Sequence, residues 1–250
     1  MKFIFLGSNS DICKSYKKSI NTNDNNIINI SRSKNSDIYI NWENEFKPFN
    51  KKALQKTKDW DILISFIGSQ SPFGLINTLD PREIVRGLNI NFSYQFAAIS
   101  QLINYRNKNK ESKIILFAGG GTNSAPTHYS VYITSKIGLI KFTELLSSEF
   151  ENIHATIIGP GWVKTKIHNP TINEGNKKAE ESYYETKRRF KENDFVEMSK
   201  VVKCINKVVY CKDDRFSGKN ISVLHDEWHR EDFLDDYSRK DSKYKLRRLT

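Results

Sequence analysis

Short apolar segments separated by helical patterns restrict most strongly how this chain can fold. Segments rich in β-branched and aromatic residues lie at 2–7, 27–31, 61–68, 113–119, 154–161 and 220–224, with a weaker one at 37–41. They are mostly apolar throughout instead of alternating, which is typical of parallel strands that are covered on both faces. Helical patterns lie between them at about 11–20, 81–106, 129–151 and 194–210. This alternation predicts an α/β fold with a doubly wound parallel sheet.

The length and composition suit one domain covering residues 1–250, because single α/β domains of about this size bury one continuous core. No apolar run approaches the roughly 20 residues of a membrane-spanning helix, and the apolar stretch after Met1 is too short for a signal-peptide core. The three cysteines lack C-x-x-C spacing, which favours a reducing compartment and no metal site. We therefore expect a cytoplasmic protein without a membrane partner.

The formal net charge of +11 raises the question of a nucleic-acid partner. The lysines are scattered along the chain, however, and they form no arginine-rich stripe and no known nucleic-acid motif. We interpret the charge as a solvated basic surface that attracts anionic small molecules, and we expect no nucleic-acid partner.

The stretch GSNSDIC at 7–13 follows the first predicted strand, where a dinucleotide-binding turn would lie. Such a turn needs a glycine, free backbone N–H groups and a helix N-terminus that faces the pyrophosphate. Gly7 meets the first need. Three small residues after it can cap the helix or donate to phosphate: Ser8, Asn9 and Ser10. Because Asp11 and Cys13 replace the two later glycines, the stretch taken alone is better explained as a simple helix N-cap.

The end of the second predicted strand bears on the choice of cofactor. NAD-selective folds place Asp or Glu there to bind the ribose 2′-hydroxyl, whereas Arg accommodates a 2′-phosphate. The chain reads SRSK at 31–34, with no carboxylate. Ser31, Arg32 and Ser33 therefore predict NADP(H) over NAD(H), since Arg can hold a phosphate in a bidentate manner. An ordinary basic turn is the alternative, and it leaves NAD(H) open.

Five motifs in a fixed order give the chain a family resemblance. They are FLGSNSDI at the first turn, FIGSQ after a later strand, LNINFSYQF in a helix, YITSK, and IIGPGWVKT after the next strand. This series resembles the classical short-chain dehydrogenases/reductases over nearly the whole chain. The resemblance implies a Rossmann-type fold and singles out Tyr132 and Lys136 as the catalytic pair. Tyr183 and Lys187 have the same spacing, but they lie in a charged stretch and precede no matching strand.

Tyr132 and Lys136 are four residues apart and therefore share one helix face. An ammonium beside the phenol favours the phenolate and lowers a pKa that starts near about 10. Tyr132 could then act as general acid for a carbonyl or general base for an alcohol. The resemblance implies that Lys136 also binds the nicotinamide ribose and that Asn91 holds a proton-relay water. In isolation, Asn91 would be interpreted as a helix-internal amide bonded to backbone.

The resemblance assigns further residues to the cofactor. It implies that the turn PGWVKT contacts the nicotinamide carboxamide and the neighbouring phosphate through Pro160, Gly161, Val163 and Thr165. Gly68 resembles the glycine that lets the cofactor pass close to the backbone. Ile12 is grouped with the first turn, and Asn41 and Trp42 are expected to flank the adenine.

The family usually carries a serine upstream of the tyrosine, and this serine donates to the substrate oxygen. The expected positions here are Ala118 and Gly119, and neither has a side-chain donor. Loss of such a donor typically costs about 10²–10³ in rate. Backbone N–H groups at 119–121 could replace it, as could the polar side chains at 122–124 or His128; otherwise the donor is lost.

These features together predict an NADP(H)-preferring oxidoreductase that transfers a hydride between nicotinamide and a carbonyl or hydroxyl carbon of a small molecule. The glycine-rich loop and the stretch from SGKNISVLHDEW to YKLRR resemble a subgroup that is associated with surface-glycan gene clusters, which points to a sugar or nucleotide-sugar. The rival hypothesis is a catalytically degenerate protein that keeps the fold and binds nucleotide or regulates, because two glycine positions and the serine are altered.

Two segments could act beyond the core of the fold. Residues 164–193 are charged and weakly patterned and follow a strand, so they predict either a substrate lid or a plain surface excursion. The tail at 225–250 could pack against a neighbouring subunit, cover the site or fray. The family resemblance implies a homodimer or homotetramer that pairs long helices across two-fold axes, and the helix at about 129–151 has apolar residues suited to this.

Overall fold

The computed structural model describes residues 1–43, 45–231, 233 and 244–246, and its centre is a parallel β-sheet. The described residues form the strands β1 (Lys2–Leu6), β2 (Asn26–Ser31), β3 (Ile38–Tyr39), β4 (Ile62–Ser65), β5 (Ser112–Phe117), β6 (Ile153–Gly159) and β7 (Lys219–Ser222). Their order is β3-β2-β1-β4-β5-β6-β7, and every neighbouring pair is parallel. The prediction of a doubly wound, Rossmann-type sheet is confirmed.

The strands are apolar throughout because both faces of the sheet are covered. In β1, Phe3 and Phe5 pack in one core and Ile4 and Leu6 pack in the other, as the two-residue period of a strand requires. All four side chains are fully buried. Burial of one such side chain contributes about 1.5–3 kcal/mol, so residues on both faces of the strand stabilise the fold.

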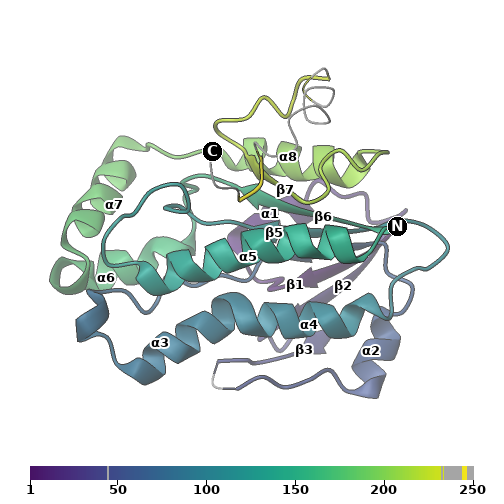
Figure 1. Ribbon diagram of the computed structural model, residues 1–250, viewed down its shortest axis with the longest axis horizontal. Helices are drawn as coiled ribbons and strands as arrows, with labels where there is room; N and C mark the ends of the chain where they lie inside the picture. The colour runs from purple at the N-terminus through teal and green to yellow at the C-terminus, as the bar shows by residue number, and fades with distance from the viewer. Residues whose placement is uncertain (44, 232, 234–243, 247–250) are drawn as a thin grey trace.

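Helices cover both faces of the sheet (Figure 1). They are α1 (Asp11–Lys17), α2 (Lys51–Thr57), α3 (Pro81–Leu88), α4 (Tyr94–Ile103), α5 (Ser130–Glu149), α6 (Asn169–Lys178), α7 (Glu180–Glu192) and α8 (Met198–Tyr210). The helices α4 and α5 cover the core that contains Ile4, whereas α1 and α8 cover the core that contains Phe3. The paired helices α6 and α7 lie at the end of the sheet where the strands finish.

The helical pattern at 81–106 contains a change of helix type. A π-helical segment, η2 (Asn89–Ser93), separates α3 from α4. Segments of this kind are rare and are frequently found at functional sites. This one contains Asn91, which the family resemblance singled out.

Residues 164–193 form regular structure that the sequence pattern did not indicate. The short 3₁₀ helix η3 (Lys166–His168) leads into α6 and α7. Ion pairs three or four residues apart support α7, joining Glu185 to Arg188 and Arg189, and Arg188 to Glu192. The density of charge that weakened the helical pattern therefore supports the helix.

The described part of the tail packs on its own chain. Trp228 is 5% exposed, its indole N–H donates to the Val223 carbonyl, and it shares the α8-covered core with Phe233. The remaining expectations for 225–250 fall largely outside the described residues. None of the helices in the described part of the chain has both the length and the apolar character that crossing a bilayer requires.

Candidate active site

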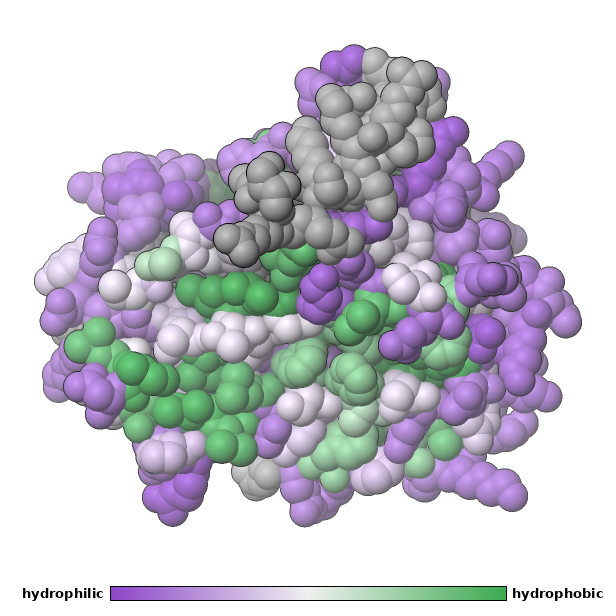
Figure 2. All heavy atoms as spheres, in the orientation of Figure 1, coloured by the Kyte–Doolittle hydropathy of each residue, from purple (hydrophilic) through white to green (hydrophobic). Residues whose placement is uncertain are grey.

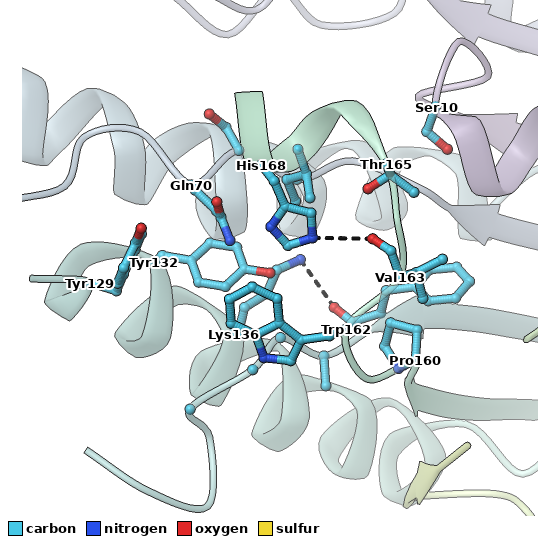
Figure 3. A pocket seen from close by; sticks show the side chains of 18 of the residues that line it. Ser10, Gln70, Tyr129, Tyr132, Lys136, Pro160, Trp162, Val163, Thr165 and His168 are labelled. Carbon is cyan, nitrogen blue, oxygen red and sulfur yellow. Dashed lines mark hydrogen bonds between the residues drawn. The ribbon is translucent and has the colours of Figure 1, made fainter. Parts of the chain in front are cut away.

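A cavity of about 620 Å³ lies where the strands end. The strand order reverses between β1 and β4, and such a switch point is where doubly wound sheets bind ligands. Segments that follow β1, β4, β5 and β6 line the cavity together with the first turns of α5. Figure 3 shows side chains that line it from close by.

Tyr132 and Lys136 both line this cavity from α5. Their side chains are almost completely buried, and the Lys136 Nζ lies 5.7 Å from the centre of the Tyr132 ring. Lys136 donates to the carbonyls of Phe117 at 3.0 Å and Ile67 at 3.4 Å. The ends of β5 and β4 therefore hold the ammonium beside the phenol.

Burial dominates the electrostatics of this pair. It raises the pKa of Tyr132 above the ordinary value and lowers the pKa of Lys136 to about 8, because each charged form loses solvation. The structure does not show the lowering of the Tyr132 pKa that the sequence suggested. At neutral pH the phenol therefore carries its proton, and the ammonium is still largely charged.

Gly119 lies directly against the catalytic tyrosine candidate. A Cβ at Gly119 would be 2.6 Å from the Tyr132 hydroxyl and 2.5 Å from the ring atom Cε1. Real Cβ atoms essentially never come that close to another heavy atom, so a serine here would displace the tyrosine. The missing serine and the position of Tyr132 are therefore linked: the phenol occupies the space of the lost side chain.

Asn91 lies beneath the cavity instead of lining it. Its side chain is fully buried, its Oδ1 accepts from the Ser69 N–H, and its Nδ2 donates to the carbonyls of Ser69 and Gly87. The Asn91 carbonyl accepts from the Gln95 amide at 2.7 Å. Asn91 thus has the backbone-bonded geometry of the alternative interpretation, and it fixes the loop after β4.

The first turn combines a tight glycine with a regular helix cap. Gly7 has φ +73°, and a Cβ there would be 2.9 Å from a side-chain atom of Ile67, so glycine alone fits this close approach. Ser10 caps α1 by accepting from the Cys13 N–H. Ser10 and Ile12 line the cavity, whereas Ser8 is buried beside it and Asn9 faces solvent.

Asp11, at the first of the two altered glycine positions, connects this turn to the loop after β6. Its carboxylate accepts from the Lys166 N–H at 2.8 Å. The Lys166 ammonium in turn donates to the Asn9 carbonyl at 2.6 Å. Both groups of Lys166 therefore bridge the cavity rim between the first turn and the loop that leads into η3.

Of the residues predicted for the adenosine end, Arg32 lines the cavity. Its side chain is 68% exposed and lies 3.3 Å from a carboxylate oxygen of Glu43. Ser31 and Ser33 are engaged with each other and with Ser36 through short local hydrogen bonds. Trp42 packs against Phe46 and Phe49 outside the cavity lining, and Asn41 accepts locally from the Glu43 N–H.

The turn after β6 also lies where it was predicted. Four predicted residues of this turn line the cavity: Pro160, Gly161, Val163 and Thr165. Gly161 has φ +74°, and a Cβ there would be 2.7 Å from Val196. Gly68 lines the opposite side, where a Cβ would be 3.6 Å from the Lys136 Nζ.

The fold and this cavity agree with the comparison to protein families. A family model described as short chain dehydrogenase matches residues 5–176, which is more than half of the chain. The chain belongs to the short-chain dehydrogenase family. It is accordingly an oxidoreductase of the NAD(P)-dependent class, as the motifs predicted. No curated protein sequence was found to match it.

Solved structures share the short-chain dehydrogenase fold at low sequence identity. A short-chain dehydrogenase/reductase from Saccharomyces cerevisiae has a TM-score of 0.76 and 16% identity, covering 94% of this chain and 98% of its own. A small-chain dehydrogenase in complex with NADPH has a TM-score of 0.70 and 16% identity, and the match covers 89% of this chain and 95% of that one. The aldohexose dehydrogenase of Thermoplasma acidophilum has a TM-score of 0.70 and 14% identity, and the match covers 89% of this chain and 92% of that one. At these identities the likeness establishes the fold alone.

Three polar side chains at the edge of the cavity form a series of hydrogen bonds that the sequence did not predict. The Tyr129 and Thr171 hydroxyl oxygens are 2.6 Å apart, and Thr171 donates to Gln70 Oε1 at 3.2 Å. Gln70 appears in the FIGSQ motif, but Thr171 is 101 residues further along the chain. The sequence contains no signal for that contact, since it depends on how α6 packs.

An aromatic stack forms another wall that was not predicted. The rings of Trp162 and His168 are stacked: their centroids are 5.0 Å apart and their planes are nearly parallel, with an angle of 5° between them. The Arg189 guanidinium from α7 lies 4.7 Å from the Trp162 ring. His168 Nε2 donates to the Val163 carbonyl at 3.1 Å, and burial lowers the His168 pKa. The stack connects α7 to the turn after β6.

Proposed function

We propose that the protein is an NADP(H)-preferring reductase or dehydrogenase that transfers a hydride between nicotinamide and a carbonyl or hydroxyl carbon of a small molecule. The observation that carries this proposal is the buried Tyr132–Lys136 pair inside the cavity at the switch point of the sheet. A phenol and an ammonium that share one helix face and open onto a ligand site suit proton transfer to a substrate oxygen.

The residues present fit a dinucleotide. Gly7 and Gly161 form tight turns, with φ +73° and +74°, in which a Cβ would collide with Ile67 and Val196, so the two turns keep their close backbone packing. Lys136 uses two of its three N–H donors on carbonyls, which leaves one for a ribose hydroxyl. Gly68 lines the cavity beside the Lys136 ammonium and adds no side chain there. These features support the sequence assignment of the cofactor to this cavity.

The cofactor and the protein have separate tasks in the reaction: the cofactor transfers the hydride, and the protein transfers the proton. When bound, the nicotinamide supplies or accepts the hydride. Tyr132, which burial keeps protonated, gives its proton to the carbonyl oxygen in reduction and takes it back in oxidation. The Lys136 ammonium stabilises the phenolate that remains after proton donation.

Arg32 supports the preference for NADP(H). It is the exposed cation of the SRSK turn that lines the cavity, and its ion pair with Glu43 is weak enough for a phosphate to replace. A structural relative at 16% identity was solved with NADPH. Both observations are compatible with a 2′-phosphate beside Arg32.

A sugar or nucleotide-sugar is the proposed substrate class. The cavity lining combines the aromatic side chains of Trp162 and His168 with the polar groups of Gln70 and Tyr129 (Figure 3). A sugar ring presents both apolar C–H faces and hydroxyls to such a wall. A structural relative at 14% identity is named an aldohexose dehydrogenase.

The helices α6 and α7 are proposed to act as the substrate lid. Cavity-lining residues come from the start of α6 and from Ser182 in α7. Since α7 touches the nicotinamide turn through Arg189 and Trp162, a movement of α7 would change the shape of the cavity.

A homodimer or homotetramer in the cytoplasm is the proposed state. Phe96 of α4 and Ile137 and Leu145 of α5 are exposed apolar residues on one face. Figure 2, in the orientation of Figure 1, shows hydrophobic side chains gathered over the face of α3 to α5. Such a face suits self-association about a two-fold axis.

The rival proposal, a nucleotide-binding protein without turnover, draws on the Asp11 carboxylate at the first turn. Titration of the purified protein with NADPH and with NADH, followed by nicotinamide fluorescence, separates the two proposals. Tighter binding of NADPH supports the cofactor assignment, and turnover of a carbonyl compound then excludes the rival. If neither nucleotide binds, the oxidoreductase proposal fails and the non-catalytic, regulatory alternative moves ahead.

Arg32→Ala tests the cofactor preference in the same titration. The variant should weaken NADPH binding more than NADH binding, because only NADPH carries the 2′-phosphate. Lys52→Ala removes the same charge from the exposed face of α2 and serves as the control. An unchanged ratio of the two affinities in Arg32→Ala would remove Arg32 from the site.

A further inference from the structure

Gln70 is the side-chain amide that lines the cavity beside the catalytic tyrosine candidate. It follows Gly68 and Ser69 at the carboxyl end of β4, and its amide group points into the cavity on the side of Tyr132 (Figure 3). Tyr129, to which Gln70 is linked through Thr171, packs in the same apolar cluster as Tyr132. Gln70 therefore belongs to the substrate end of the cavity.

The hydrogen bonds of Thr171 determine which end of the Gln70 amide is available. A threonine hydroxyl has a single hydrogen. Thr171 gives that hydrogen to Gln70 Oε1 at 3.2 Å, so Tyr129 is the donor in the 2.6 Å contact with Thr171. The Gln70 Oε1 atom therefore already accepts a hydrogen bond from Thr171. Gln70 Nε2 has no acceptor among the described residues, and its two N–H groups face the cavity.

The backbone that carries Gln70 is held from below. Asn91 accepts from the N–H of Ser69 at 2.8 Å and donates to the carbonyl of the same residue at 2.9 Å. This two-point contact fixes the peptide immediately before Gln70. A donor that is positioned by packing before the substrate arrives costs little reorganisation during reaction.

The position of the usual serine, Gly119, is closed to any side-chain donor. A Cβ there would collide with the Tyr132 hydroxyl at 2.6 Å, and Ala118 offers a methyl group. Residues 118 and 119 therefore supply no side-chain donor to the substrate oxygen, which leaves the backbone N–H groups of this loop and polar side chains elsewhere in the cavity lining. The Gln70 Nε2 satisfies this need, since it is fixed, unpaired within the described structure and open to the cavity.

We propose that the Gln70 amide N–H binds the substrate oxygen that Tyr132 protonates, and so takes the place of the missing serine hydroxyl. The proposal rests on the oxidoreductase function proposed above. It assigns Gln70 as the residue that orients the carbonyl, with Thr171, Tyr129 and Asn91 as positioning residues. It also predicts that the substrate presents an oxygen acceptor, not a donor, to Gln70 at the reacting carbon.

The test measures kcat/KM for reduction of 2,3-butanedione by NADPH, because this small dicarbonyl needs little recognition beyond its oxygen atoms. Gln70→Ala should lower kcat/KM by about 10²-fold, the typical effect of removing one oxyanion donor. Gln70→Glu keeps the size but loses the N–H donors, so it should not restore activity. The affinity for NADPH should stay unchanged in both variants. Gln55→Ala, in the exposed part of α2, is the matched control and should behave as wild type.

Thr171 provides the test of positioning. Thr171→Val removes the hydroxyl that orients the amide and should lower kcat with little change in NADPH affinity, whereas Thr171→Ser should restore the rate. Both variants should melt at the wild-type temperature. If Thr171 only stabilised the fold, two equally stable variants would have the same kcat.

The outcomes separate the two proposals. If Gln70→Ala retains wild-type kcat/KM while Tyr132→Phe is inactive, the oxidoreductase function stands and the role of Gln70 is overturned. A parallel loss of NADPH affinity in Gln70→Ala would also overturn it, by assigning the residue to the cofactor. If the wild-type protein does not reduce 2,3-butanedione although it binds NADPH, the proposal for Gln70 fails, and the broader function depends on other carbonyl compounds.

Discussion

The chain contains two tyrosine–lysine pairs with the same four-residue spacing, and they differ in burial and in the residues around them. The Lys136 Nζ lies 5.7 Å from the Tyr132 ring centre, and the Lys187 Nζ lies 5.2 Å from that of Tyr183. The first pair is buried in α5 at the cavity, whereas Lys187 is exposed on α7. Two backbone carbonyls hold Lys136 in place. A four-residue spacing therefore supplies proximity, and the surroundings supply the chemistry.

The largest expected effect separates the two tyrosines. Tyr132→Phe removes the proton donor and should lower kcat by about 10²–10⁴, the usual contribution of general acid–base catalysis, while NADPH affinity stays nearly intact. Tyr183→Phe is the matched variant and should retain turnover. Comparable activity in the two variants, measured as NADPH oxidation, would contradict the assignment of Tyr132.

A smaller loss is expected when the space beside each tyrosine is filled. Gly119→Ser restores the family's usual residue but should lower turnover, because its Cβ would displace the Tyr132 hydroxyl. Misplacement of a reacting group by about 1 Å can cost about 10²-fold. Gly175→Ala fills space beside Tyr183, where the nearest atom is 3.1 Å away, and should act on thermal stability more than on turnover. A gain of activity in Gly119→Ser would show that the tyrosine can move without loss.

The burial of Lys136 should affect how the stability of the protein depends on pH. Burial lowers the pKa of Lys136 from 10.5 to about 8, so between these values the unfolded state binds more protons and stability rises with pH. Below about pH 8 the penalty for burying the charge is complete. The stability of Lys136→Met relative to wild type should therefore decrease as pH rises from about 8 toward 10.

The measurement is the free energy of unfolding of wild type, Lys136→Met and Lys187→Met at several pH values. Lys187→Met makes the same substitution at an exposed position and is the matched control. A flat difference for Lys136→Met would mean that the ammonium is not penalised by its burial.

The sheet could be predicted from local sequence patterns, whereas the catalytic pair could be predicted because five motifs in a fixed order resemble a family. Apolar runs such as 2–7 and 113–119 reflect burial on both faces, and YITSK places two side chains on one helix face. The helix α7 was missed because its apolar pattern is weak and its support comes from ion pairs.

The polar wall of the cavity could not be predicted for a different reason. Thr171 meets Gln70, and Lys166 meets Asp11, only after segments more than 100 residues apart are brought together. The effect of Gly119 is likewise three-dimensional: the sequence indicates a lost serine, whereas the structure shows that Tyr132 occupies its space. Contacts of this kind leave no periodicity and no spacing in the chain.

The bridge between Asp11 and Lys166 has a consequence for how the protein responds to ionic strength. The lysine at the cavity rim already donates to a carboxylate and a carbonyl of its own chain. A phosphate that arrives there competes with an internal anion, and added salt screens both attractions. Cofactor affinity should therefore fall less steeply with salt than a chain of net charge +11 would suggest.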